Sequence, residues 1–111
     1  MAFSEDKKTR LAVYKAMQEI VAAGMDVCSM MVRDSRLSVK DDYSNIVALS
    51  REGVFDKELK SSLEEANGLR NRLVHGYNTL NGDVAFKSIQ DLLPWFKDFI
   101  GVISSWMKKK Q

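Results

Sequence analysis

The first third of the chain carries apolar side chains at helical spacing. They recur every three or four positions between residues 11 and 31, which is the period of an α-helix. This stripe consists of Leu11, Tyr14, Met17, Val21, Met25, Cys28 and Met31. A weaker second stripe consists of Ala12, Ala16, Ile20, Ala23 and Val27. The pattern predicts a helix from Ser4 or Glu5 to about Val32 with two neighbours, and a second copy of the chain is a candidate for one of them.

The middle of the chain predicts two further helices. Polar residues 34–40 indicate a connection, and a short helix follows at about residues 41–52, before Gly53. Asp56 is suited to cap the next helix, which fades after His75 and Gly76. The apolar positions of that helix are Leu59, Leu63, Ala66, Leu69 and Leu73.

The last third of the chain predicts a long final helix. Asn78 to Gly82 reads as a turn because an Asn-Gly pair tolerates positive φ. Asp83 then caps a helix to about Lys109, with a kink expected at Pro94. The whole pattern predicts an all-α chain, an up-down four-helix bundle with an additional short helix, and a single domain over residues 1–111.

The composition indicates the cellular compartment of this bundle. The single cysteine, Cys28, cannot form an internal disulfide, which fits a reducing compartment. The charged N-terminus lacks a signal-peptide pattern, and no run approaches the roughly 20 apolar residues of a membrane span. We therefore expect a cytoplasmic protein without membrane contact. The net charge of +2 is too small to indicate nucleic-acid binding by itself, and Lys108 to Lys110 suit a helix C-terminus.

The segment from Arg70 to Tyr77 concentrates side chains that can act on phosphate. It contains two arginines, whose planar forks match phosphate oxygens, and the only histidine, which exchanges protons near neutral pH. Tyr77 adds a hydroxyl and a stacking face. A simpler interpretation stays open: His75 is a helix C-terminal residue favoured by the helix dipole, and the arginines form a solvated face.

The spacing within this segment limits how its residues cooperate. At about 100° per residue, Arg70 and His75 lie about 140° apart on a straight helix, whereas Asn71 and Arg72 share a face with His75. Arg70 and His75 converge on one phosphate if the helix breaks near Gly76, if the arginine bends round, or if a second subunit contributes. We favour the second subunit.

These residues resemble a known family signature. Arg70, Asn71 and His75 form the R-N-x-x-x-H signature of HEPN domains, and Gly76-Tyr77 extends it to the R-x-x-x-x-H-x-Y pattern of HepT-like toxins. The resemblance spans roughly residues 16–99. It includes the segment 41–55, which is similar to an S/D-Y…L…G-V segment of that branch, and an acidic position on the first helix, here Asp26.

The resemblance implies a fold, an activity and partners. It implies a homodimeric helical bundle whose paired motifs face each other between subunits and cleave RNA as a metal-independent endoribonuclease, without a cofactor. Such proteins are toxins of type VII HEPN/MNT toxin–antitoxin systems, neutralised when an MntA-like nucleotidyltransferase antitoxin transfers AMP to the motif tyrosine. By this resemblance His75 is the acid/base group and Arg70 holds the scissile phosphate. Asn71 supports the site, and Tyr77 is the AMPylated residue.

The first helix departs from the family pattern at one position. Family members often carry a histidine a turn after the helix acid, and Met30 stands in that region here. A supporting role for the first helix therefore rests on Asp26, which could equally be a polar residue at a subunit seam. Two other functions remain as alternatives: a non-catalytic dimeric nucleotide- or RNA-binding subunit of a two-component nucleotidyltransferase, and a purely structural helical dimer.

Overall fold

Four helices make up the computed structural model, which describes residues 7–76 and 82–110. Their bounds are α1 Lys7–Asp34, α2 Asp42–Arg51, α3 Lys57–Gly76 and α4 Gly82–Lys110. The all-α class is confirmed. The predicted count of four helices plus a short one is too high for the described residues, because the short helix α2 is itself one of the four.

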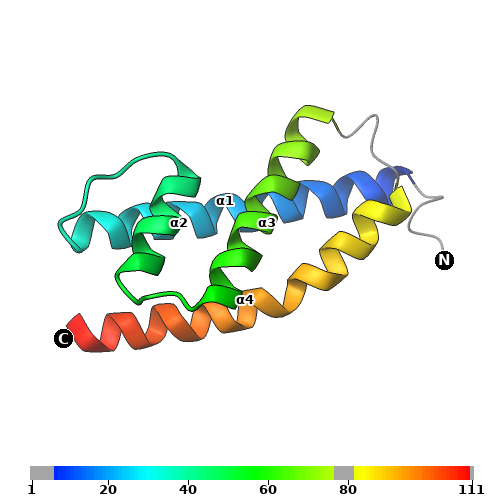
Figure 1. Ribbon diagram of the computed structural model, residues 1–111. Coiled ribbons are helices and arrows are strands. Elements are labelled where there is room, and N and C mark those ends of the chain that lie inside the picture. The colour runs from blue at the N-terminus through cyan, green and yellow to red at the C-terminus, as the bar shows by residue number, and fades with distance from the viewer. Residues whose placement is uncertain (1–6, 77–81, 111) are drawn as a thin grey trace.

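The three long helices alternate in direction (Figure 1). The helices α1 and α4 both run toward the end of the molecule that holds the C-terminus, and α3 runs back between them. The helix α2 is too short to cross the bundle, so it does not reverse the chain as a full-length helix would. The first and last helices are therefore parallel, unlike those of a four-helix up-down bundle.

Local signals set the beginnings of α2 and α3. The Asp41 carboxylate accepts a hydrogen bond from the Ser44 N–H at 2.8 Å, and the Asp56 carboxylate accepts one from the Leu59 N–H at 2.7 Å. These side chains satisfy N–H groups that the first turn of a helix leaves unpaired. Between the two helices, Gly53 adopts a φ of 78°, a backbone conformation that favours glycine. The hydrogen bond from the Leu59 N–H confirms the predicted cap at Asp56.

The final helix differs from its prediction at the start. It begins at Gly82, so Asp83 is the second residue of α4 and not a residue before it. Pro94 lies inside the continuous helix α4, which bends in its middle (Figure 1). A proline removes one backbone hydrogen bond and crowds the preceding turn, which accounts for the bend.

The core lies where α1, α3 and α4 meet, with α2 closing one end. Buried members of the first stripe of α1 pack there. The largest fully buried side chains of the described residues are Met31, Ile46, Leu49, Leu63, Leu69 and Leu73. Most of the second stripe stays on the surface: Ala12, Ala16 and Ala23 are exposed, and Ile20 is 37% exposed, whereas Val27 is half-buried and packs against the core. Within one chain, the first stripe is therefore covered by its neighbours, and the second stripe is covered only at Val27.

Small and aromatic residues join α1 to α4. A Cβ atom added to Gly24 would lie 3.3 Å from Phe99 Cε2 and 3.8 Å from the Trp95 ring, so the missing side chain lets these rings approach α1. Phe99 also meets Phe55, from the α2–α3 connection, edge-on at a centroid distance of 5.9 Å. Phe99 therefore ties the connection to both long helices.

The lone cysteine belongs to this core. Cys28 is fully buried, and its burial raises the pKa of the thiol to about 12, with the Asp42 carboxylate contributing to the rise. The reactive form of a cysteine is the thiolate. Cys28 is therefore a protonated packing residue at neutral pH and not a nucleophile.

A buried asparagine ties the α1–α2 connection to both helices. The Asn45 side chain is 1% exposed, and its Oδ1 accepts a hydrogen bond from the Lys40 N–H at 2.8 Å. Its Nδ2 donates to the Lys40 carbonyl at 3.1 Å and to Ser29 Oγ at 3.2 Å. All of these bonds disappear if the amide is removed.

Substitution Asn45→Ala should lower the free energy of unfolding by about 2–3 kcal/mol, because it leaves the Lys40 N–H and carbonyl without their partner. Ser29→Ala removes only the longest of the three bonds and should cost about 1 kcal/mol or less. The control Arg51→Ala, at an exposed position of α2, should change the free energy of unfolding by less than about 0.5 kcal/mol. Urea denaturation followed by circular dichroism measures all three, and equal losses for Asn45→Ala and Arg51→Ala would contradict this role.

Candidate functional site

The last two turns of α3 carry the predicted site. Arg70 and Asn71 are half-buried, Arg72 is exposed, and the backbone of His75 lies in the same helix. No hydrogen bond or salt bridge joins the side chain of Arg70, Asn71 or Arg72 to another described residue. Both guanidinium groups therefore keep their donors for a ligand, and a guanidinium matches the paired oxygens of a phosphate.

The helix is continuous through this segment. The helix α3 extends from Lys57 to Gly76, so it does not break between Arg70 and His75. The two positions therefore diverge by about 140° around the helix, as the spacing predicts. Of the three ways in which they could meet on one phosphate, a bend of the long arginine side chain and a contribution from a second subunit are left. Tyr77 lies outside the described residues.

The other predicted site residue is on α1. Asp26 is exposed, and no salt bridge or hydrogen bond joins it to Arg70 or Asn71 within the described part of the chain. The structure of one chain therefore does not bring Asp26 together with the α3 residues through a direct bond. Its supporting role stays a prediction.

The structure also shows a buried polar residue that the sequence analysis did not select. Asn67 is 2% exposed, one turn before Arg70, and its Oδ1 has no hydrogen-bond partner among the described residues. Leaving such an oxygen unpaired costs about 1–3 kcal/mol. Asn67 can be recognised in the sequence because it lies four residues after Leu63, so its polar side chain interrupts the apolar face of the helix.

A second missed feature lies on the outer face of α3. Gly68 is mid-helix, and a Cβ there would lie 3.5 Å from both Arg72 Nη1 and the Tyr43 hydroxyl. Tyr43 of α2 and Arg72 of α3 therefore both lie beside the glycine. Gly68 and Arg72 are four residues apart, and His75 follows three residues later. By this spacing, positions 68, 72 and 75 lie on the same face of α3.

The described residues contain neither a metal-binding cluster nor a membrane-spanning helix. No three His, Cys, Asp or Glu side chains in this part of the chain lie close enough together to hold a metal ion. None of the described helix segments is long and apolar enough to cross a membrane.

A family comparison decides the relationship of this chain to known proteins. The family profile described as Ribonuclease HepT-like matches residues 1–103 of the 111. The chain belongs to the HepT-like ribonuclease family. The match confirms the resemblance that the motif between Arg70 and Tyr77 indicates.

Individual members of the HepT-like family agree with this assignment. A provisionally named RNase of Archaeoglobus fulgidus is 35% identical over 89 residues, which cover 80% of this chain and 67% of the relative. The mRNA nuclease HepT of Shewanella oneidensis is 27% identical over 104 residues, covering 93% of this chain and 78% of the relative. The chain thus spans two thirds to about four fifths of the length of these HepT-like relatives.

Solved structures show the same fold. The tri-AMPylated HEPN toxin of Shewanella oneidensis, in complex with an MNT antitoxin, superposes with a TM-score of 0.86 at 27% identity. The match covers 94% of this chain and 79% of the toxin. A toxin–antitoxin crystal structure with AMP-PNP also gives a TM-score of 0.86, at 26% identity. The HepT-like chain therefore has the HEPN toxin fold.

Proposed function

We propose that this protein is a metal-independent endoribonuclease, the toxin of a type VII HEPN/MNT toxin–antitoxin system. The observation that supports this proposal most is the end of α3, where Arg70 and Arg72 have no salt-bridge partner among the described residues. Both lie on the helix that carries His75. Relatives named as mRNA and tRNA nucleases support RNA as the substrate.

The chemistry needs only groups that the protein and the RNA supply. A 2′-hydroxyl of RNA attacks the adjacent phosphorus, its proton passes to a base, and the bond to the 5′-oxygen of the next nucleotide breaks as that oxygen takes up a proton. His75 moves these protons, and the Arg70 guanidinium stabilises the negative charge that builds up on the phosphate oxygens. Asn71 and Asp26 support the site.

The divergence of Arg70 and His75 on α3 favours a site shared between two subunits. A homodimer provides an arginine and a histidine on separate helices, and two histidines allow one to accept a proton while the other donates one. Light scattering at micromolar concentration should give the mass of a dimer. A monomer under these conditions would remove the shared site.

The proposed off-switch is a nucleotidyltransferase antitoxin similar to MntA. The antitoxin transfers AMP from ATP to the Tyr77 hydroxyl, with release of pyrophosphate. AMP so close to the arginines adds a negative charge and bulk where the RNA phosphate binds. The tri-AMPylated relative in complex with an MNT antitoxin supports this proposal.

The direct test of the nuclease function is incubation of the purified chain with RNA in the presence of EDTA. Cleavage that continues in EDTA and requires His75 is the expected result. RNA binding without cleavage, at high protein concentration, would contradict the nuclease function and favour a non-catalytic RNA-binding subunit.

A further inference from the structure

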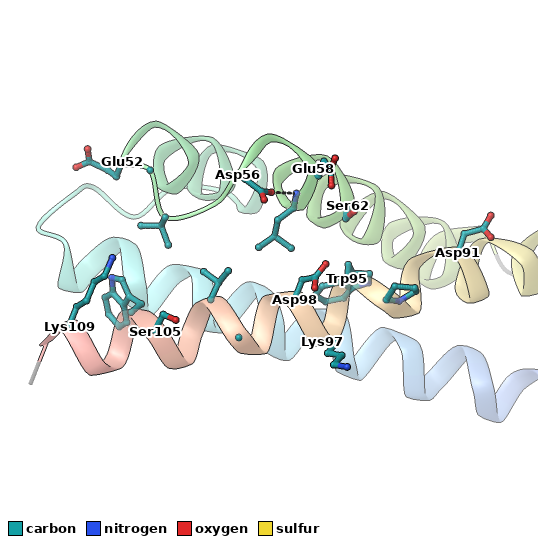
Figure 2. A pocket seen from close by; sticks show the side chains of 17 residues that line it. Glu52, Asp56, Glu58, Ser62, Asp91, Trp95, Lys97, Asp98, Ser105 and Lys109 are labelled. Carbon is teal, nitrogen blue, oxygen red and sulfur yellow. Dashed lines mark hydrogen bonds between the residues drawn. The ribbon is translucent and has the colours of Figure 1, made fainter.

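A groove follows the second half of α4, away from the end of α3 that carries His75. One wall is α4, and the other is the α2–α3 connection with the first turns of α3 (Figure 2). Its apolar floor is formed by Val54, Leu59, Val102 and Trp106. We call it the α4 groove. It belongs to the described part of the chain and has no role in the proposed RNA cleavage.

The rim of the α4 groove is acidic. Glu52 and Glu58 lie on the connection side and Asp98 lies on α4, and none of them forms a salt bridge with a described residue. In total five acidic residues line the groove against two lysines, Lys97 and Lys109, although the chain as a whole carries a charge of +2. Two of the five are already engaged, because Asp91 pairs with Lys87 at 3.6 Å and Asp56 caps α3. Figure 2 shows the Lys97 side chain extending away from the wall that holds Glu58. The groove therefore repels RNA and attracts a cationic ligand.

Both tryptophans of the chain line this groove. Trp95 is 3% exposed, and its indole N–H has no acceptor among the described residues. This N–H is enclosed within the protein, so the half-buried Trp106 is the tryptophan whose ring a ligand in the groove can reach. Indole rings also attract the guanidinium and ammonium groups of arginine and lysine. The tryptophans and the acidic rim therefore favour the same kind of ligand.

The groove is open along its α4 wall. Gly101 lies on the groove wall of α4, and a Cβ added there would have no heavy atom within 4 Å. The lining residues on α4 extend from Asp91 to Lys109, which is long enough for several residues of a peptide. A small ion or a single metabolite would leave most of the apolar floor uncovered.

We propose that the α4 groove is the docking site for a basic amphipathic segment of a second protein. Apolar side chains of that segment pack on Val54, Val102 and Trp106. Its arginines or lysines face Glu58 and Asp98. This combination of apolar anchors and opposite charges is a common mode of peptide recognition in grooves.

The two tryptophans report occupancy of the groove directly. The probe is a synthetic amphipathic helix of leucine, alanine and arginine without tryptophan, titrated into the intact protein while intrinsic fluorescence is recorded. We expect a saturable change in tryptophan emission that weakens as salt is added. An otherwise identical peptide with glutamate in place of arginine should give no change.

A pair of charge-matched variants locates the binding surface. The double variant Glu58→Gln/Asp98→Asn should weaken binding of the basic peptide roughly tenfold. The control Glu19→Gln/Glu65→Gln changes the net charge equally at exposed sites outside the groove and should bind like the wild type. Circular dichroism establishes that both variants are folded, and both should cleave RNA at the wild-type rate.

Several results would overturn this proposal. They are no binding of the basic peptide, equal weakening by the two double variants, or an equal response to the glutamate peptide. An RNA oligonucleotide that changes the emission and loses its effect in Glu58→Gln/Asp98→Asn would show a nucleic-acid groove instead. Self-association that only this variant abolishes would show that a second copy of the chain is the occupant. None of these outcomes depends on whether the protein cleaves RNA.

Discussion

Substitution His75→Ala is expected to reduce RNA cleavage in EDTA by about 100- to 10,000-fold, the usual contribution of a proton-transfer residue. The variant loses the group that is proposed to move the proton of the 2′-hydroxyl or of the leaving oxygen. It retains the arginines that are proposed to bind the phosphate, so RNA affinity should change far less than the cleavage rate. Single-turnover cleavage and RNA-binding measurements separate the two effects.

A neighbouring position provides the matched control for His75→Ala. Val74 is 45% exposed in the same turn of α3, so Val74→Ala shortens a side chain beside the histidine without removing a titrating group. This variant should cleave RNA at the wild-type rate. Equal activity of His75→Ala and Val74→Ala, with both proteins folded, would show that the histidine has no catalytic role.

Incubation with the nucleotidyltransferase partner and ATP is expected to add AMP to Tyr77 and to stop RNA cleavage. Each AMP brings a phosphate charge close to Arg70 and Arg72, where it competes with the substrate phosphate for the same donors. Intact mass spectrometry should show the added AMP, and the same sample should lose nuclease activity. Tyr77→Phe lacks the accepting hydroxyl and should gain no mass.

Tyr43 is the control for the site of this modification. It is 42% exposed on α2, so it is an accessible tyrosine outside the motif. Tyr43→Phe should still gain AMP and lose activity. Retention of the added mass in Tyr77→Phe, or its loss only in Tyr43→Phe, would place the modification elsewhere.

The helices were predictable because their signals are local. The stripe of α1, the caps at Asp41 and Asp56 and the positive φ at Gly53 depend only on residues within one or two turns. A cap at Asp83 puts the start of α4 two residues late, because helix boundaries vary by a residue or two around any capping signal. The error in helix number came from adding α2 to a four-helix count that already included it.

The motif between Arg70 and Tyr77 can also be recognised from the sequence alone. Two arginines, an asparagine and the only histidine, at fixed spacing, are a property of the order of residues. They were sufficient to indicate the HepT-like family. The spacing further predicted that Arg70 and His75 diverge, because a helix has a constant rotation per residue, and the continuous helix α3 agrees with this.

Sequence order alone thus determined the helices, the motif and the family, because each depends on residues close together in the chain or on a fixed spacing. Only the tertiary structure decided which groups meet across helices. It buried Asn45 between Lys40 and Ser29, left Asn67 Oδ1 without a described partner, and placed both tryptophans in one acidic groove. Such contacts join residues far apart in sequence, so they depend on how the helices pack, which no local pattern encodes.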